Sequence, residues 1–163
     1  MKIVSWNING IRAAIKNGFP ESLAKINPDV IGLQEVKIDN DRRAAEAFEF
    51  KGYEDHWHSA KKPGYAGTAI LTKVKPLKLM AGIDLSHFDD EGRTITAEYE
   101  KFYFINNYFP NAQPGLKRIK YKEDYNRDLL AYAKKLEKKK PVIIVSDLNM
   151  AMKKINLARP KEN

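Results

Sequence analysis

The stretch VIIVSDLN at residues 142–149 joins an unbroken run of four apolar residues to Asp147 and Asn149. Such a run is typical of a strand that is buried on both faces of a sheet. The stretch VIGLQE at residues 30–35 repeats the pattern, with Glu35 close behind the apolar run. Two buried strands that each lead into a carboxylate predict a layered α/β domain whose polar groups gather at the strand ends.

Short apolar runs alternate with amphipathic segments along the rest of the chain, which indicates an α/β (α+β layered) fold. We expect strands at residues 2–6, 29–34, 53–59, 68–72, 77–83, 93–99, 102–107 and 141–146. We expect helices at residues 11–16, 20–26, 42–48 and 115–139, the last with Tyr125, Leu129 and Leu136 on its apolar face.

Composition narrows the class of protein. The chain has 163 residues, a formal net charge of +8 and no cysteine, and its apolar content of 43% excludes a disordered chain. No apolar stretch is long enough to span a membrane, and the first residues become polar too soon for a signal peptide. We therefore expect a cytoplasmic protein without disulfides. The excess of positive charge indicates a polyanionic partner such as nucleic acid.

Polar side chains follow four of the expected strands. Asn7, Glu35 and Tyr108 each come after one strand, and Asp147 and Asn149 come after another. Loops at the carboxyl ends of strands in layered α/β folds meet at one edge, where ligands bind. Carboxylate and amide oxygens there suit a hard cation such as Mg²⁺. The alternative for each residue is a turn former, a helix cap or an ordinary surface residue.

Eight short motifs, in order along the whole chain, resemble the exonuclease III family of apurinic/apyrimidinic (AP) endonucleases. They are SWNINGIRA at 5–13, LQEVK at 33–37, GYAG at 64–67, EGR at 91–93, NYFPNA at 107–112, RIKYK at 118–122, DLN at 147–149 and INLARPKEN at 155–163. Several motifs in a fixed order are far more specific than any one of them.

The resemblance implies a role for each polar residue at the strand ends. Glu35 would ligate Mg²⁺, with Mn²⁺ as an alternative ion, and Asn7 would lie beside the metal. Tyr108 would contact the reacting phosphate, Asp147 would orient or deprotonate the attacking water, and Asn149 would help to hold water and phosphate. In-line attack on a phosphodiester needs both an activated water and neutralised phosphoryl charge.

The resemblance also implies the substrate, which is double-stranded DNA with abasic or 3′-blocked sites. The implied activity is cleavage of the backbone 5′ to an abasic site, with 3′→5′ exonuclease and 3′-phosphatase activity. Five residues are expected to contact phosphates or DNA, namely Asn9, Arg12, Asn111, Lys117 and Arg118. Such contacts position DNA without reading its sequence.

The implied fold is an incomplete four-layer αββα sandwich of mixed sheets flanked by helices, formed by one domain over residues 1–163. Family members continue well beyond the motif at 155–163 and end in a Ser-Asp-His motif that has no counterpart here. None of His56, His58 and His87 lies in a matching motif, and the first two are expected to be ordinary strand residues rather than metal ligands. Ser146, Met150 and Met152 also depart from the usual pattern.

These departures predict apolar sheet surface that this chain does not cover. We expect a C-terminally truncated or split copy that works with a complementing C-terminal half or by self-association. Two alternatives stay open. One is a catalytically incomplete remnant of the fold that binds DNA or a partner, and the other is a relative that hydrolyses phosphoinositides or sphingolipids. The motifs NYFPNA and RIKYK argue against the lipid hydrolase.

Overall fold

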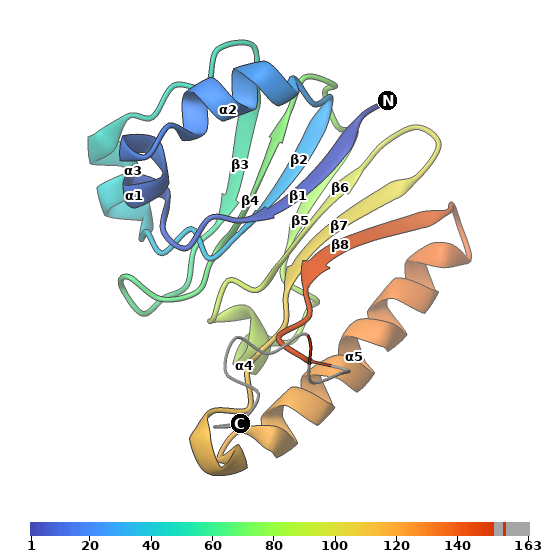
Figure 1. Ribbon diagram of the computed structural model, residues 1–163. Coiled ribbons are helices and arrows are strands. Elements are labelled where there is room, and N and C mark those ends of the chain that lie inside the picture. Colours follow the sequence, from blue (N-terminus) through green and yellow to red (C-terminus); the bar gives the residue numbers. More distant parts are fainter. Residues whose placement is uncertain (152–154, 156–163) are drawn as a thin grey trace.

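Two four-stranded mixed sheets pack face to face, and helices cover the outer face of each (Figure 1). The structure, a computed structural model, describes residues 1–151 and 155. Met152 and almost all of the motif at 155–163 lie outside the described residues. No helix within residues 1–151 is both long and apolar enough to cross a bilayer.

The first sheet has the strand order β1-β2-β4-β3. Its strands are β1 (Ile3–Asn7), β2 (Val30–Gln34), β3 (Glu54–His58) and β4 (Thr68–Thr72). β1 and β2 are parallel, whereas the two pairs that contain β4 are antiparallel. Because β1 and β2 are parallel, their C-terminal ends lie at the same end of the sheet.

The second sheet has the order β5-β6-β7-β8. Its strands are β5 (Lys78–Ala81), β6 (Thr94–Glu98), β7 (Tyr103–Tyr108) and β8 (Val142–Asp147). β7 and β8 are parallel, and the other pairs are antiparallel. The two parallel pairs lie on the same side of the sandwich, and contacts join β1 to β8 and β2 to β7.

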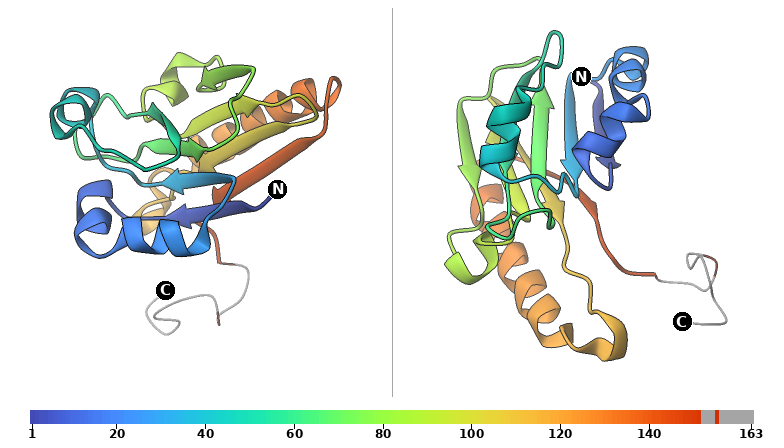
Figure 2. Two further views of the ribbon diagram at one scale, coloured as in Figure 1. Left: turned by 90° about the horizontal axis from the view of Figure 1, so that it is seen from above. Right: turned by 90° about the vertical axis from the view of Figure 1, so that its left-hand side faces the viewer.

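The helices form the two outer layers (Figure 2). α1 (Ile11–Lys16), α2 (Phe19–Ile26) and α3 (Asn40–Glu46) lie on the first sheet. α4 (Ser86–Asp89) and α5 (Ile119–Glu137) lie on the second, and a 3₁₀ turn, η1 (Pro114–Leu116), precedes α5. The described residues thus confirm the expected layers of mixed sheets flanked by helices.

Helix ends differ from the expected positions for local reasons. α5 begins at Ile119 rather than at 115, because Gly115 has a φ of 69° that is not helical. α3 begins earlier than expected, because the Asp39 side chain accepts a hydrogen bond from the Arg42 backbone N–H at 2.9 Å and caps the helix. α4 was not predicted, since four residues are too few to show helical periodicity.

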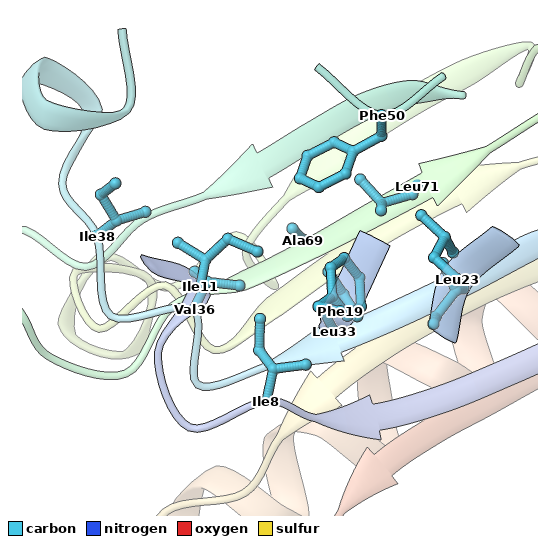
Figure 3. Packing of buried hydrophobic residues seen from close by; sticks show 11 residues of the cluster. Ile8, Ile11, Phe19, Leu23, Leu33, Val36, Ile38, Phe50, Ala69 and Leu71 are labelled. Carbon is cyan, nitrogen blue, oxygen red and sulfur yellow. The ribbon is translucent and has the colours of Figure 1, made fainter. Parts of the chain in front are cut away.

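The first outer helix layer is held by a cluster of buried hydrophobic side chains (Figure 3). Ile11 of α1 and Phe19 and Leu23 of α2 pack against Leu33 of β2 and Leu71 of β4. Each is at most 4% exposed. Burial of a side chain of this size contributes about 1.5–3 kcal/mol, so this layer holds the loop after β1 in place.

A buried polar contact fixes the position of one sheet relative to the other. Asn106 of β7 is fully buried, and its Nδ2 donates to the carbonyl oxygens of Leu33, at 2.9 Å, and Ala69, at 2.8 Å. Its Oδ1 accepts from Gln34 Nε2 at 2.6 Å. Gly32 makes this approach feasible, because a Cβ there would lie 2.7 Å from Asn106 Oδ1.

One prediction about burial is wrong. The run at residues 142–145 does not form a strand buried on both faces, because Ile143 is 36% and Ile144 is 46% exposed. β8 is the last strand of its sheet, so one of its edges pairs with β7 and the other has no strand among the described residues. β1 lies beside β8 and also ends its sheet (Figure 1). We call the unpaired sides of β1 and β8 the open edge.

Candidate active site

The four expected strand ends meet on one side of the molecule. Asn7 ends β1, Glu35 follows β2, Tyr108 ends β7 and Asp147 ends β8. The Asn7 Nδ2 donates to Glu35 Oε1 and to Asp147 Oδ2, each at 2.7 Å. One amide thus joins two carboxylates that are 112 positions apart in the sequence. The expected convergence of the two acids is confirmed.

Glu35 is held as a carboxylate by its neighbours. Its Oε2 forms an ion pair with Lys37 Nζ at 2.8 Å, and Asn7 donates to Oε1. Burial alone raises the pKa of Glu35, but the hydrogen bonds from Lys37, Asn7 and Tyr108 outweigh burial and lower this pKa below its usual value. Glu35 is therefore charged at neutral pH.

Tyr108 faces the same centre from the second sheet. It is 8% exposed, and its side chain meets those of Glu35 and Asn149. Burial, more than any neighbouring charge, raises the pKa of Tyr108 to about 12. The phenol therefore keeps its proton at neutral pH and can act as a hydrogen-bond donor.

The loop after β8 is folded back on itself. The backbone N–H of Asn149 donates to Asp147 Oδ1 at 2.9 Å, and the Asn149 Nδ2 donates to the carbonyl oxygen of Phe109 at 2.8 Å. Asn149 has a φ of 46°, a left-handed conformation that asparagine tolerates well. These contacts bring Asn149 beside Tyr108. Ser146 lies within β8, so this departure from the family pattern leaves the strand intact.

Lys122 of α5 holds this loop through hydrogen bonds to its backbone. Only 7% of Lys122 is exposed, and its Nζ donates to the carbonyl oxygens of Pro110, Leu148 and Asn149 at 2.8, 3.0 and 3.2 Å. Burial lowers the pKa of Lys122 from its usual value. The ammonium group thus ties the loop after β7 to the loop after β8.

Lys122→Met is expected to lower the free energy of unfolding by about 2 kcal/mol, because three carbonyl oxygens lose a charged donor. Urea unfolding followed by circular dichroism measures the change. Lys120→Met is the matched control, since Lys120 is exposed on the same helix. Equal unfolding curves for the two variants would contradict the supporting role.

The five residues expected to contact DNA lie in the loop after β1, in α1 and in the segment between β7 and α5. Asn9 is exposed and accepts a hydrogen bond from Lys37, and Asn111 and Lys117 are exposed in the segment between β7 and α5. Arg12 is exposed and lines a surface pocket of about 580 Å³ that Lys37 also lines. Arg12 forms a long ion pair with Glu46 at 3.9 Å, whereas Arg118 is paired closely, since its Nη2 donates to Glu91 Oε1 at 2.6 Å.

The site offers carboxylate oxygens that a divalent cation could use. Within residues 1–151 there is no group of three His, Cys, Asp or Glu side chains that could hold a metal. Mg²⁺ accepts one or two carboxylates and completes its shell with water and phosphate oxygens. Glu35 is a charged oxygen donor here. The Asn7 nitrogen faces the carboxylates and its Oδ1 accepts from the Asn9 backbone N–H at 3.0 Å, so its role beside a metal stays a prediction.

Sequence reasoning assigned no role to Tyr65, Glu91 or Arg93, although all three lie in quoted motifs. The structure places them behind Tyr108. Gly92 between them cannot be replaced freely: its φ is 63°, and a Cβ would lie 2.4 Å from the His58 carbonyl oxygen. The signal in the sequence was their place in the quoted motifs GYAG at 64–67 and EGR at 91–93.

The sequence profile of the Endonuclease/Exonuclease/phosphatase family matches residues 4–163. The chain belongs to this family. The DNA-(apurinic or apyrimidinic site) endonuclease of Dictyostelium discoideum is 44% identical over the whole chain, which spans 45% of that protein. An exodeoxyribonuclease of Bacillus subtilis is 41% identical, and the chain spans 64% of it.

Solved structures of the same kind match the fold. The 3′-5′ exonuclease NExo from Neisseria meningitidis has a TM-score of 0.83 and 26% identity, over 99% of this chain and 63% of that one. The AP endonuclease from Leishmania major has a TM-score of 0.81 and 27% identity, over 92% of this chain and 55% of that one. The chain of this family member thus covers about half to two thirds of these relatives.

Proposed function

We propose that the chain carries the metal- and water-binding half of a Mg²⁺-dependent DNA-repair phosphodiesterase that cleaves DNA at abasic or 3′-blocked sites. The observation that carries the proposal is the Asn7 amide, which joins Glu35 and Asp147 at 2.7 Å each. The net charge of +8 suits a polyanionic substrate. The absence of cysteine is compatible with work in the reducing cytoplasm.

The residues divide the chemistry between them. Mg²⁺ held by Glu35, with Mn²⁺ as an alternative, would neutralise charge that develops on the phosphoryl oxygens. Asp147 orients the attacking water and accepts its proton, and Asn149 holds water and phosphate in line. Tyr108 donates a hydrogen bond to a phosphoryl oxygen, which its raised pKa of about 12 allows at neutral pH. Asn9, Arg12, Asn111 and Lys117 contact flanking phosphates.

The proposal includes a partner at the open edge. The relatives extend beyond the region that this chain spans. The edge strands β1 and β8 lie side by side, and β8 exposes Ile143 and Ile144. An unpaired strand edge with apolar side chains is a template for another strand. We propose that a polypeptide equivalent to the unmatched part of the relatives pairs there and completes the site.

Incision of a duplex oligonucleotide with one abasic analogue tests the function. The chain is assayed alone, and joined to or mixed with the part of the Bacillus subtilis exodeoxyribonuclease outside the matched region. Cleavage that requires Mg²⁺ and stops with EDTA supports the proposal, and its appearance only with the added polypeptide supports the partner. Binding of the same duplex without cleavage in every mixture would instead favour a binding remnant.

Ile144→Lys is expected to reduce self-association of the chain alone, because a charged residue on an edge strand opposes pairing. Sedimentation velocity over a range of concentrations measures the effect. Leu130→Lys is the matched control, since Leu130 is 55% exposed on a helix, α5, rather than on an edge strand. The same reduction in both variants, or none in either, would contradict pairing at β8.

A further inference from the structure

Arg93, which directly precedes β6, is buried behind the candidate site. Its side chain is 3% exposed, and all three guanidinium nitrogens donate hydrogen bonds. Nε donates to Glu91 Oε2 at 2.6 Å, Nη1 to the Tyr108 carbonyl oxygen at 3.1 Å and Nη2 to Tyr65 Oη at 3.1 Å. A guanidinium group with every nitrogen engaged has a fixed plane.

Tyr108 is held by this arginine at three points. The Arg93 carbonyl oxygen accepts from the Tyr108 backbone N–H at 2.8 Å, and the Nη1 contact satisfies the Tyr108 carbonyl. The guanidinium carbon lies 5.0 Å from the centroid of the Tyr108 ring, within the range of a cation–π contact. Backbone and ring of Tyr108 are thus oriented by one residue.

Arg93 is itself held in a closed ring of four side chains. Arg118 donates from Nη1 to Tyr65 Oη at 2.9 Å and from Nη2 to Glu91 Oε1 at 2.6 Å. The Glu91 carboxylate and the Tyr65 hydroxyl therefore each bridge Arg93 and Arg118. Since Arg118 is 20% exposed and Arg93 only 3%, the ring connects the protein surface to the buried side of Tyr108.

We infer that Arg93 is a positioning residue, which holds Tyr108 against Glu35 and Asn149 while Glu91, Tyr65 and Arg118 hold Arg93. The inference deepens the proposed function and rests on it for the role of Tyr108. It also changes the role expected of Arg118, which acts here through Arg93.

The charge balance of the ring argues against a purely stabilising role for the ion pair between Arg93 and Glu91. Two guanidinium groups share the single carboxylate of Glu91, so one positive charge in the ring has no anionic partner of its own within residues 1–151. Burying such a charge costs free energy, and buried ion pairs by themselves are weak evidence for stability. The Tyr65 hydroxyl and the Tyr108 carbonyl and ring take up the remaining interactions of Arg93, which fits a positioning role.

Fluorine NMR with 3-fluorotyrosine at position 108 tests the inference on the chain itself. Arg93→Met and Arg93→Lys are both expected to move the Tyr108 resonance toward that of free fluorotyrosine. Methionine removes the hydrogen-bond donors, and lysine keeps the charge but lacks the planar guanidinium group. A second label at Tyr53, whose hydroxyl donates to Pro28 in the other sheet layer, should not move. Arg127→Met, at an exposed arginine of α5, should leave both resonances unchanged.

Each result of the NMR experiment supports or overturns the positioning role of Arg93. An unchanged Tyr108 resonance in Arg93→Met overturns the inference, and so does full restoration by lysine, which would show that charge alone suffices. Loss of the Tyr53 resonance in both variants would show a global structural role and also overturn it. In the complemented enzyme, Arg93→Lys should lower kcat about 100-fold with little change in KM. If that enzyme is inactive, the proposed function fails while the NMR result still stands.

Discussion

Glu35→Gln and Asp147→Asn should each lower the incision rate of the complemented enzyme about 1,000-fold. The physical reasons differ. Glutamine at 35 removes the charge that attracts the metal, so its defect should shrink as Mg²⁺ is raised. Asparagine at 147 removes the proton acceptor, so its defect should persist at saturating Mg²⁺. Gel analysis of abasic-site cleavage across a Mg²⁺ titration measures both effects.

Glu137→Gln is the control for the loss of one carboxylate, because Glu137 is exposed at the end of α5 that lies away from the site. This variant should cleave like the unaltered enzyme. Wild-type rates for both Glu35→Gln and Asp147→Asn would show that the carboxylates joined by Asn7 do not carry the chemistry. Identical Mg²⁺ dependence in the two variants would contradict the division of roles.

Asn106→Leu should lower the free energy of unfolding by about 3 kcal/mol. Leucine leaves the carbonyl oxygens of Leu33 and Ala69 and the Gln34 amide without their buried partner. These groups lie between the sheets, where water does not replace the lost hydrogen bonds. Urea unfolding followed by tryptophan fluorescence measures the change, since Trp6 and Trp57 lie in strands β1 and β3 of the first sheet.

Asn126→Leu is the matched control. Asn126 lies on α5, and its side-chain oxygen has no hydrogen-bond partner among the described residues. The same substitution there removes no such contact and should change stability far less. A similar loss in both variants would mean that the contact between the sheets is not the source of the effect.

Strand positions could be predicted closely from apolar runs. Each of the eight expected strands matches an observed one to within a few residues, because strands 4–8 residues long leave a clear pattern. Helix ends were less predictable. The start of α5 depends on the backbone of Gly115, and the start of α3 on the cap from Asp39. Both are local geometries that residue type alone does not specify.

Some features of the candidate site could likewise be predicted from the sequence, and others could not. Asn7, Glu35, Tyr108 and Asp147 were predictable because each follows a strand, and parallel strands bring such positions to one edge. The burial of residues 142–145 was predicted wrongly, since burial depends on which strands lie next to β8, and no pattern within the run contains that information.

Residue order along the chain was sufficient to predict a layered α/β domain, its strand ends and the acids that they carry, because hydrophobic periodicity and chain direction are properties of the sequence. The ring of Tyr65, Glu91, Arg93 and Arg118, and the support of Asn149 by Lys122, come instead from the stacking of the sheets and the docking of α5. Their members are separated by 2 to 53 positions, and hydrogen bonds between side chains so placed form only once the backbone has brought the loops together.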